Sequence, residues 1–573
     1  MRPPEAVALP APFTFLEARN FFRCRAGGLD GPTVASLRSC LARTVWAGTV
    51  SSRRSFEPAQ FRAGTVSSRH SFEPAQFRAR GSAIGILVID IGSSAVRTSV
   101  VRPDGTIEAR RQVGTSPDRP FPGLVELDGA ALAGAVMTAA RSSLDEAGRV
   151  DGVGITNQRG TTIVWDASTG EPVGPALSWQ DLRTLGTCLE LQAEGLRLAP
   201  NESATKLAWL LDTYDPDRRR DLRFGTLDTW VAWLLTDGSA HITDPSNAAV
   251  SGLLPTEAVL AGQSDLVWDE SRLERLRVPD KCMPALVAST GLLAEATALA
   301  GAPPICGMVG DQQASLIGQG CVRPGDAKAT FGTGAFLDVN IGGSPPPFGA
   351  SGKSGPSGCF PIIAWEREGT LTWGVEAVML SAGTALSWLV DDLGILSSPA
   401  ESAEVAERCA DTGDVSFVPA LIGLGTPDWD FGARSLLIGM TSGTGRPEVV
   451  RAVLRGIAQR GADLLEAAED DAGRAVSRLR VDGGMTANPV FVQELANACR
   501  RPVEIAAELE ATSLGAGLLA GLGTGMWSTY EDVASVITPR SIVEPSGDDG
   551  RLRWKEALSR SRQWIPELSE LKF

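Results

Sequence analysis

The chain has 573 residues, too many for one hydrophobic core, so at least two large domains are expected. Its composition, 43% apolar and 21% charged, is that of an ordinary globular enzyme, and no apolar run approaches the ~18 residues of a membrane span. The net charge of −15 argues against nucleic-acid or anionic-membrane partners, two histidines argue against a histidine metal site, and nine cysteines without a CxxC pair predict reduced thiols in a cytoplasmic protein.

Residues 1–83 differ from the rest of the chain in charge and pattern. The first 80 residues carry twelve arginines and five acids, and Ala47–Arg62 is repeated as Ala63–Arg78 with the single change of Arg54 to His70. A segment with no hydrophobic periodicity and with two nearly identical copies of one stretch is expected to be a disordered extension, or the product of a start codon placed too far upstream. Its excess of Arg and Ser over acids leaves an organelle presequence as the alternative.

The first predicted strand, residues 84–91, ends in the turn Asp90–Ser94, and the chain then returns as a second strand over residues 96–101. A further turn at Pro103-Asp104-Gly105 leads into a third strand from Thr106. Amides and hydroxyls in such a turn of small residues can hold a polyphosphate. In Walker loops and dinucleotide folds the glycines open a helix, so a phosphate turn inside a β-hairpin favours an actin-like kinase instead.

Strands and helices alternate along the rest of the chain. A second strand–turn–strand, residues 326–340 around Gly332-Thr333-Gly334, repeats the phosphate-turn pattern. A polar helix is predicted over residues 203–212. The other predicted elements are helices over residues 130–146, 447–469, 489–499 and 513–522, strands over residues 150–156, 304–309 and 502–506, and a strand ending at Asp482. The pattern predicts two α/β domains, residues 84–322 and 323–573, with a nucleotide between them.

Phosphoryl transfer to an alcohol needs phosphate-binding groups, a metal ion, a base for the hydroxyl proton and exclusion of water. Ser93, Ser94 and Thr333 are candidates for the phosphates, and Asp90, at the end of its strand, is a candidate for orienting Mg²⁺ through water. Asp311 follows another strand and is flanked by a glycine and two glutamines, which suits a general base.

Each of these motifs also has an ordinary structural interpretation. An Asp between a strand and a helix, like Asp311, is usually an N-cap, and Asp482-Gly483-Gly484 can be a plain turn. Trp179 and Trp209 can be core aromatic residues. The case for a kinase therefore rests on the joint order of hairpin turn, strand-end Asp, second hairpin turn and Asp-Gly-Gly.

With these motifs in order, the chain resembles the FGGY carbohydrate kinases from about Ile84 to the C-terminus, and among them a divergent branch of the glycerol kinases. The motifs that carry the resemblance are Gly154–Arg159, Trp165-Asp166, Ser178–Arg183, Thr205–Trp209, Phe224–Trp230, Gly310–Ala314, Phe331–Gly334, Gly423–Pro427 and Val481–Gly484. The resemblance implies two α/β domains of the ribonuclease-H-like kind, as in actin, Hsp70 and the sugar kinases, which close over ATP and substrate.

The resemblance also implies roles for individual residues. It makes Asp311 the base, and it makes Asp90 the residue that holds Mg²⁺ through water. The positions implied to contact ATP are Ser93, Ser94, Arg97, Thr333, Gly383, Gly484 and Asn488, and those implied to contact the polyol are Arg159, Trp179, Asp311, Gln312 and Phe336.

Two positions depart from the glycerol-kinase pattern. Glycerol kinases carry Glu directly after the arginine, where this chain has Gly160, and Tyr where it has Asn201. Loss of both hydroxyl-bonding groups is expected to weaken glycerol binding by ~10²–10⁴-fold if nothing compensates. Gly160 is also expected to open space for a larger polyol.

The sequence therefore predicts an ATP- and Mg²⁺-dependent kinase that phosphorylates a terminal hydroxyl of glycerol or a related polyol. The alternatives are a kinase for a larger sugar or sugar alcohol, such as a pentulose or a tetritol, and a non-catalytic ATP-binding sensor or scaffold. A cytoplasmic homodimer or homotetramer is expected, with a small-molecule substrate and without nucleic-acid or membrane partners.

Overall fold

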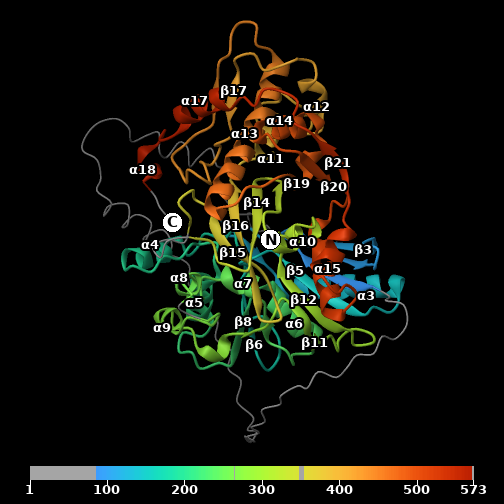
Figure 1. Ribbon diagram of the computed structural model, residues 1–573. Coiled ribbons are helices and arrows are strands. Elements are labelled where there is room, and N and C mark those ends of the chain that lie inside the picture. The colour runs from blue at the N-terminus through green and yellow to red at the C-terminus, as the bar shows by residue number, and fades with distance from the viewer. Residues whose placement is uncertain (1–84, 263–264, 348–353, 571–573) are drawn as a thin grey trace, which may run out of the picture. The chain divides into compact units, whose positions relative to one another are not determined.

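The computed structural model describes residues 85–262, 265–347 and 354–570 (Figure 1). The predicted extension of residues 1–83, with its tandem repeat, lies outside the described residues. No helix within the described ranges is long and apolar enough to cross a bilayer. Two large sheets, of six and seven strands, organise the described part of the chain.

The first sheet has the strand order β11-β12-β5-β1-β2-β3. Its members are β1 (Ile86–Ile91), β2 (Ala95–Val101), β3 (Ile107–Gly114), β5 (Gly152–Asn157), β11 (Thr290–Glu295) and β12 (Pro304–Gly310). The strands β1, β2 and β3 are antiparallel neighbours, which confirms the predicted hairpin, whereas β5 is parallel to both β1 and β12. β1 is buried along its whole length, as a strand covered on both faces must be, and this explains its nearly continuous apolar sequence.

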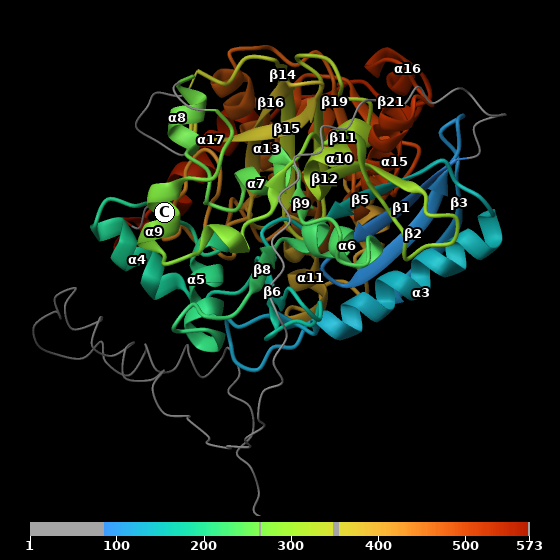
Figure 2. The same ribbon diagram turned by 90° about the horizontal axis from the view of Figure 1, so that it is seen from below.

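Helices cover both faces of this sheet. α3 (Gly129–Ala147) begins after Asp128, whose carboxylate accepts hydrogen bonds from the amides of Ala130 and Ala131, and the helix runs along β1, β2 and β3 (Figure 2). α6 (Leu227–Leu235) belongs to the same hydrophobic cluster. The opposite face is covered by α10 (Asp311–Gly318) and α15 (Ala511–Thr524).

The contact between α10 and α15 depends on glycine. A Cβ atom on Gly318 would overlap the carbonyl oxygen of Ala511, and one on Gly515 would overlap that of Ala314. These small residues let the two helix backbones approach, so that α15, from late in the chain, lies beside α10 on the first sheet (Figure 1). Because α10 starts where β12 ends, this packing fixes the position of Asp311.

Further smaller elements lie between β3 and β11 in the chain, and some of them share a hydrophobic cluster of their own. They are β4 (Glu126–Leu127), β6 (Ile163–Asp166), β7 (Ala176–Leu177), β8 (Leu222–Gly225), β9 (Ile242–Thr243), β10 (Ala285–Leu286), α4 (Leu185–Ala193), α5 (Ser203–Tyr214), α7 (Pro245–Ala249), α8 (Thr256–Leu260), α9 (Glu270–Arg275) and the 3₁₀ helix η1 (Asp280–Cys282). The helix predicted over residues 203–212 is present as α5, but the prediction that it is polar is wrong, because eight of its residues are buried, Lys206 among them. Trp209 on this helix is partly buried beneath the guanidinium of Arg183, 4.5 Å from the ring centre.

The second sheet has the order β15-β16-β14-β13-β19-β20-β21. Its members are β13 (Ala327–Phe331), β14 (Ala335–Gly342), β15 (Phe360–Arg367), β16 (Thr370–Met379), β19 (Leu479–Asp482), β20 (Val503–Ala506) and β21 (Pro539–Val543). Strands β16, β14 and β13 are antiparallel neighbours, and β19 and β20 follow in parallel, so the arrangement of β3, β2, β1, β5 and β12 is repeated. An antiparallel meander extended by parallel strands is the ribonuclease-H-like fold of actin and Hsp70, and its presence in both sheets confirms the predicted fold class.

Helices also pack on the second sheet (Figure 1). α13 (Arg446–Ala472) has Pro447 in its first turn and ends at Gly473, whose φ of +60° suits a helix C-terminus, and α14 (Pro489–Cys499) packs beside it. The remaining elements after β13 in the chain are α11 (Gly383–Asp391), α12 (Glu401–Ala406), α16 (Tyr530–Ser535), α17 (Arg551–Ser561), α18 (Pro566–Ser569), β17 (Ser416–Val418), β18 (Leu436–Ile438) and the 3₁₀ helix η2 (Gly484–Ala487).

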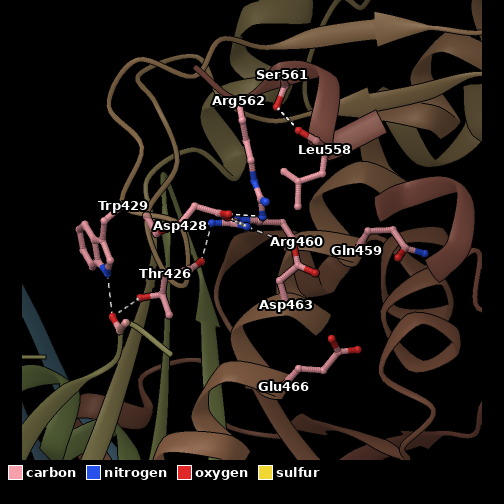
Figure 3. Close-up of polar contacts among 12 residues, drawn as sticks. Thr426, Asp428, Trp429, Gln459, Arg460, Asp463, Glu466, Leu558, Ser561 and Arg562 are labelled. Carbon is pink, nitrogen blue, oxygen red and sulfur yellow. Dashed lines mark hydrogen bonds and ion pairs between the residues drawn. The ribbon is translucent and has the colours of Figure 1, made fainter. Parts of the chain in front are cut away.

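Charged side chains join α13 to α17 near the C-terminus (Figure 3). Arg460 on α13, only 1% exposed, contacts Asp428 at 2.6 Å and Asp463 at 3.1 Å. Asp463 in turn accepts hydrogen bonds from Arg551 of α17 at 2.6 Å and from the indole of Trp554 at 3.0 Å. These contacts fix α17 to α13.

Candidate active site

The carboxyl ends of β1, β5 and β12 bring together residues that are far apart in the sequence. Asp90 in β1 and Val309 in β12 both pair with Thr156 of β5, so Asp90 and Asp311 lie near one edge of the sheet. Ligands of parallel sheets bind outside the carboxyl ends of the strands. This edge is therefore the candidate site.

Asp311 is the first residue of α10, and its side chain does not cap the helix. Gly310 holds the N-cap position, and the Asp311 carboxylate accepts a hydrogen bond from the amide of Gln312 at 2.8 Å. The Nε of Arg159 lies 3.4 Å from it, and 30% of the Asp311 side chain is exposed. Burial raises the pKa of Asp311, although Arg159 and Lys328 act against the shift. A partly accessible carboxylate of raised pKa can accept a proton from a bound hydroxyl.

Asp90 is more deeply buried than Asp311. The Nη1 of Arg97, its partner on β2, lies 3.9 Å away, and the hydroxyl of Ser513 on α15 donates to it at 3.3 Å. The pKa of Asp90 is raised to about 7, chiefly by burial; Arg97 opposes this shift and the charge of Asp311 adds to it. The two carboxylates therefore repel each other, and a divalent cation near them would relieve the repulsion.

Arg159 connects the two sheets. It follows the end of β5, its Nη2 lies 2.6 Å from Glu376 Oε2 in β16, and its Nε faces Asp311. Burial raises the pKa of Glu376, and the Arg159 charge opposes this shift. The Nη1 of Arg159 is buried and has no hydrogen-bond partner among the described residues, so it is available to a ligand.

A second buried cation lies beside Gln312. The Nζ of Lys328 in β13 lies 2.8 Å from Asp338 Oδ2 in β14 and donates to Gln312 Oε1 at 2.7 Å. Neither charged side chain is exposed. Because the Gln312 oxygen accepts from Lys328, the amide orientation is set, and the Nε2 group is what Gln312 can offer to a ligand hydroxyl.

The first predicted phosphate turn lies beside Trp179. Ser93 and Ser94 are exposed at the tip of the β1–β2 hairpin. The Ser93 hydroxyl donates to Gln158 at 2.8 Å, and the indole Nε1 of Trp179 lies 3.5 Å from Ser93 Oγ. Ser93, which is predicted to contact the phosphates of ATP, and Trp179, which is predicted to contact the polyol, are therefore adjacent. Phe336, also predicted to contact the polyol, lies on β14 of the other sheet and is partly buried.

The second predicted phosphate turn, Gly332-Thr333-Gly334, packs against the start of α11. The amide of Thr384 donates to the Thr333 carbonyl at 3.2 Å. A Cβ atom on Gly383 would lie 2.6 Å from the Gly332 carbonyl oxygen. Gly383 is thus needed for the close packing between the turn and the helix.

Two glycines beside this turn face open space. A Cβ atom on Gly484 would meet no atom within 4 Å, and one on Gly332 would meet only the Gly334 carbonyl oxygen, at 3.9 Å. Since β13 and β19 are parallel neighbours, these glycines follow adjacent strand ends. Backbone that is open in this way can be approached closely by a nucleotide.

Asn488 has a structural role at the position predicted to bind ATP. Its Oδ1 accepts hydrogen bonds from the amides of Val490 and Phe491 at 3.0 and 3.1 Å, which caps α14, and its Nδ2 donates to Ser402 of α12 at 3.0 Å. One hydrogen of the Asn488 side-chain amide therefore remains to bind a nucleotide.

The expectation that Gly160 opens space for a larger polyol is wrong. Gly160 has a φ of +71°, and a Cβ atom there would lie 2.5 Å from the carbonyl oxygen of Asn201 and 3.7 Å from the Cβ of Trp179. The backbone at residue 201 occupies the volume that a side chain at position 160 would need. The space beside Gly160 is therefore occupied by the backbone of another loop.

The sequence reasoning missed three charged residues, Lys328, Asp338 and Glu376. Each interrupts an otherwise apolar stretch of a strand, and this is a signal, because a buried charge needs a partner. Lys328 faces Asp338 across β13 and β14, and Asp338 faces Glu376 across β14 and β16. These pairings follow from the strand register, which the sequence alone does not specify.

Two family models match the chain. The N-terminal domain of the FGGY family of carbohydrate kinases matches residues 85–318, and the C-terminal domain of the same family matches residues 327–524. A glycerol kinase of Gloeobacter violaceus is 37% identical over 499 residues, which cover 84% of this chain and 97% of the relative. Glycerol kinase 2 of Thermotoga maritima is 38% identical over 504 residues, which cover 84% of this chain and 99% of the relative.

Solved structures agree with these matches. Plasmodium falciparum glycerol kinase with ADP gives a TM-score of 0.76 at 26% identity, over 84% of this chain and 99% of that one. The xylulose kinase of Rhodospirillum rubrum, with a TM-score of 0.71 at 22% identity over 83% of this chain and 97% of that one, shares the fold. Both halves of the sequence match one family, and the relatives are matched along nearly their whole length. The chain therefore belongs to the FGGY family of carbohydrate kinases, enzymes that transfer a phosphoryl group.

Proposed function

We propose that this enzyme transfers the terminal phosphoryl group of ATP to a terminal hydroxyl of glycerol or a related short polyol. The observation that carries the proposal is the pair formed by Asp311 and Arg159 at the edge of the first sheet. A carboxylate that can take a proton lies there 3.4 Å from a guanidinium whose Nη1 is buried and has no partner among the described residues. The names of the relatives, glycerol kinases, support glycerol as the substrate.

Asp311 is the base in the proposed reaction. A polyol hydroxyl within hydrogen-bond reach of its carboxylate gives up its proton to an Asp311 oxygen while the hydroxyl oxygen attacks the γ-phosphorus of ATP. The bond between that phosphorus and the β,γ-bridging oxygen breaks, and its electrons leave with ADP. The raised pKa makes Asp311 a stronger base than an ordinary carboxylate, and Arg159 favours the ionised form in which it can accept the proton.

We propose that the polyol binds at the carboxyl ends of β1, β5 and β12, between residues of the first half and Phe336 of the second sheet. The proposed contacts are Arg159, Trp179, Gln312 and Phe336. Arg159 Nη1 and Gln312 Nε2 can donate to hydroxyl oxygens, and the Trp179 ring offers an apolar face to the carbon chain. Because the Asn201 backbone fills the volume beside Gly160, the geometry favours a short polyol over a pentulose.

The two glycine turns are proposed to bind ATP. The proposed contacts are Ser93, Ser94, Arg97, Thr333, Gly383, Gly484 and Asn488. We propose that Asp90 orients Mg²⁺ through water, and the site suits a divalent cation because the charge of Asp311 adds to the burial that raises the pKa of Asp90. When bound, Mg²⁺ spreads the charge of the transferred phosphoryl group.

The first test is ADP release by the full chain with Mg-ATP and a panel of glycerol, erythritol, xylitol, ribitol and xylulose. Saturable turnover with glycerol is expected, and Asp311→Asn should lower kcat by ~10²–10⁴-fold while the affinity for ATP changes little. Turnover with xylulose but not with glycerol would show that the substrate is a larger sugar. ATP binding without turnover on any polyol would favour a non-catalytic ATP-binding sensor or scaffold.

Other features stay predictions at this point. They are the division into domains of residues 84–322 and 323–573, the cytoplasmic location, and a homodimeric or homotetrameric state.

A further inference from the structure

Lys206 is a buried lysine that the proposed reaction does not use. It lies on α5, and none of its side chain is exposed. Its Nζ donates hydrogen bonds to three backbone carbonyls, those of Gly160 at 2.9 Å, Ser178 at 3.0 Å and Asn201 at 3.3 Å. An ammonium group has three hydrogens, so each can be matched by one carbonyl, which offsets the cost of burying the charge.

The three carbonyls belong to three separate segments, and each segment contains a position implicated in polyol binding. Gly160 follows Arg159, Ser178 precedes Trp179, and Asn201 stands where glycerol kinases carry Tyr. One side-chain atom therefore joins the backbones of all three segments.

These segments are packed too closely to move independently. The Asn201 carbonyl oxygen lies 2.5 Å from the place that a Cβ atom on Gly160 would occupy. The same oxygen is one of the three that accept a hydrogen bond from Lys206 Nζ. A further contact, from the Trp179 amide to the Thr161 hydroxyl at 3.3 Å, joins two of the same segments. Displacing the Asn201 carbonyl would therefore shift the backbone beside both Arg159 and Trp179.

We propose that Lys206 is a positioning residue for the polyol site, which holds Arg159 and Trp179 in place by joining the backbones of residues 160, 178 and 201. The inference rests on the function proposed above. It assigns Lys206 to the polyol and not to ATP, because the three segments carry none of the proposed phosphate or adenosine contacts.

The test compares Lys206→Met, which keeps the length of the side chain without donors, with Leu211→Ala as a control. Leu211 lies on the same helix, is 1% exposed and belongs to the apolar cluster of α5. In Lys206→Met the KM for glycerol should rise at least ~10-fold, as expected for loss of hydrogen bonds to a charged group, while the KM for Mg-ATP stays within about twofold. In Leu211→Ala both KM values should stay near those of the wild type.

A second measurement separates this inference from the proposed function. Hydrogen exchange followed by mass spectrometry should show faster exchange in Lys206→Met for peptides that cover residues 159–163, 177–182 and 199–203, with little change in α13. This readout decides the role of Lys206 as the joining residue even if the wild type phosphorylates no polyol, in which case the proposed function fails by itself.

Lys206→Leu, which also lacks donors, provides the same comparison if Lys206→Met does not fold. A glycerol KM within twofold of the wild type in either folded variant, an equal rise in both KM values, or unchanged exchange in the three segments would overturn the proposal.

Discussion

Two groups of charged side chains in this protein differ in their balance of charge. The Arg460 network consists of Arg460, Arg551 and Arg562 with Asp428, Asp463 and Glu466, three cations and three carboxylates joined by ion pairs. Figure 3 shows the part of it in which Asp428 lies between Arg460 and Arg562. The strand-edge cluster consists of Asp90, Asp311, Asp338 and Glu376 with Arg97, Arg159 and Lys328, four carboxylates and three cations.

The difference indicates two uses of buried charge. In the Arg460 network three arginines balance three carboxylates, so the network holds elements of the fold together. In the strand-edge cluster burial raises the pKa of Asp90, Asp311 and Glu376, which means that the folded protein holds these carboxylates at a cost. A cation and a proton-donating substrate would lower that cost, as the proposed reaction requires.

The largest expected effect comes from removing one carboxylate from each group. Asp463→Asn leaves Arg460 and Arg551 short of a negative charge and should lower the free energy of unfolding by about 3–5 kcal/mol. Asp311→Asn removes excess negative charge and should leave the free energy of unfolding unchanged or higher. Urea unfolding of both variants and of the wild type measures the contrast, and equal destabilisation by the two substitutions would contradict it.

The partly buried His241, which lies outside both clusters, provides a reference. His241 donates from Nε2 to the Phe224 carbonyl at 2.7 Å and packs edge-on against Trp165 and Trp233, with ring centres 5.5 and 5.9 Å away. Burial lowers its pKa from 6.5 to about 4. Between these pH values the unfolded chain binds a proton that the folded chain does not, so the free energy of unfolding falls as the pH falls, by up to ~1.4 kcal/mol per pH unit.

His241→Gln should lack this contribution to the pH dependence. Urea unfolding of wild type and variant at several pH values between 4 and 6.5 gives the difference between them, in which the shared carboxylate titrations cancel. The advantage of the wild type should shrink as the pH falls, and a difference that is constant with pH would show that His241 keeps its ordinary pKa.

The cation expected at the strand-edge cluster is tested by Asp90→Asn. Loss of this carboxylate should raise the Mg²⁺ concentration for half-maximal ADP release by about 10-fold, since a charged hydrogen bond through water is lost. The control is Asp228→Asn, because Asp228 is also buried, with a pKa raised to about 7, and is bound to Thr243 at 2.8 Å. An equal change of the Mg²⁺ requirement in both variants would argue against a role of Asp90 in holding the metal.

The smallest expected effect is that of Glu376→Gln. The amide keeps a hydrogen-bond acceptor for Arg159 but removes the charge, so the KM for glycerol should rise by roughly 3–10-fold with little change in the KM for ATP. Glu504→Gln is the matched control, because Glu504 is a buried carboxylate paired with Arg480 at 3.0 Å in the outer part of the second sheet. A larger rise of the glycerol KM in Glu504→Gln than in Glu376→Gln would contradict the proposed role of Glu376 at the polyol site.

Much of the fold could be predicted from local patterns. The hairpin over Ile86–Val101, the second hairpin around Thr333 and the helices α3 and α14 follow from apolar periodicity, turn residues and caps, all of which act over a few residues. The strand-end positions of Asp90 and Asp311 were predicted for the same reason. Their proximity also follows, because parallel strands present their carboxyl ends at one edge.

The sequence by itself thus determined the two repeated halves, the two hairpin turns and the strand-end acids. Only the tertiary structure decided that Asn201 closes the space beside Gly160, that Lys206 is buried among three carbonyls, that Asn488 caps α14, and that Glu376 reaches Arg159 from the other sheet. Each of these contacts joins residues whose distance depends on strand register and on how helices and loops pack. Such long-range packing leaves no signal in the spacing of neighbouring residues.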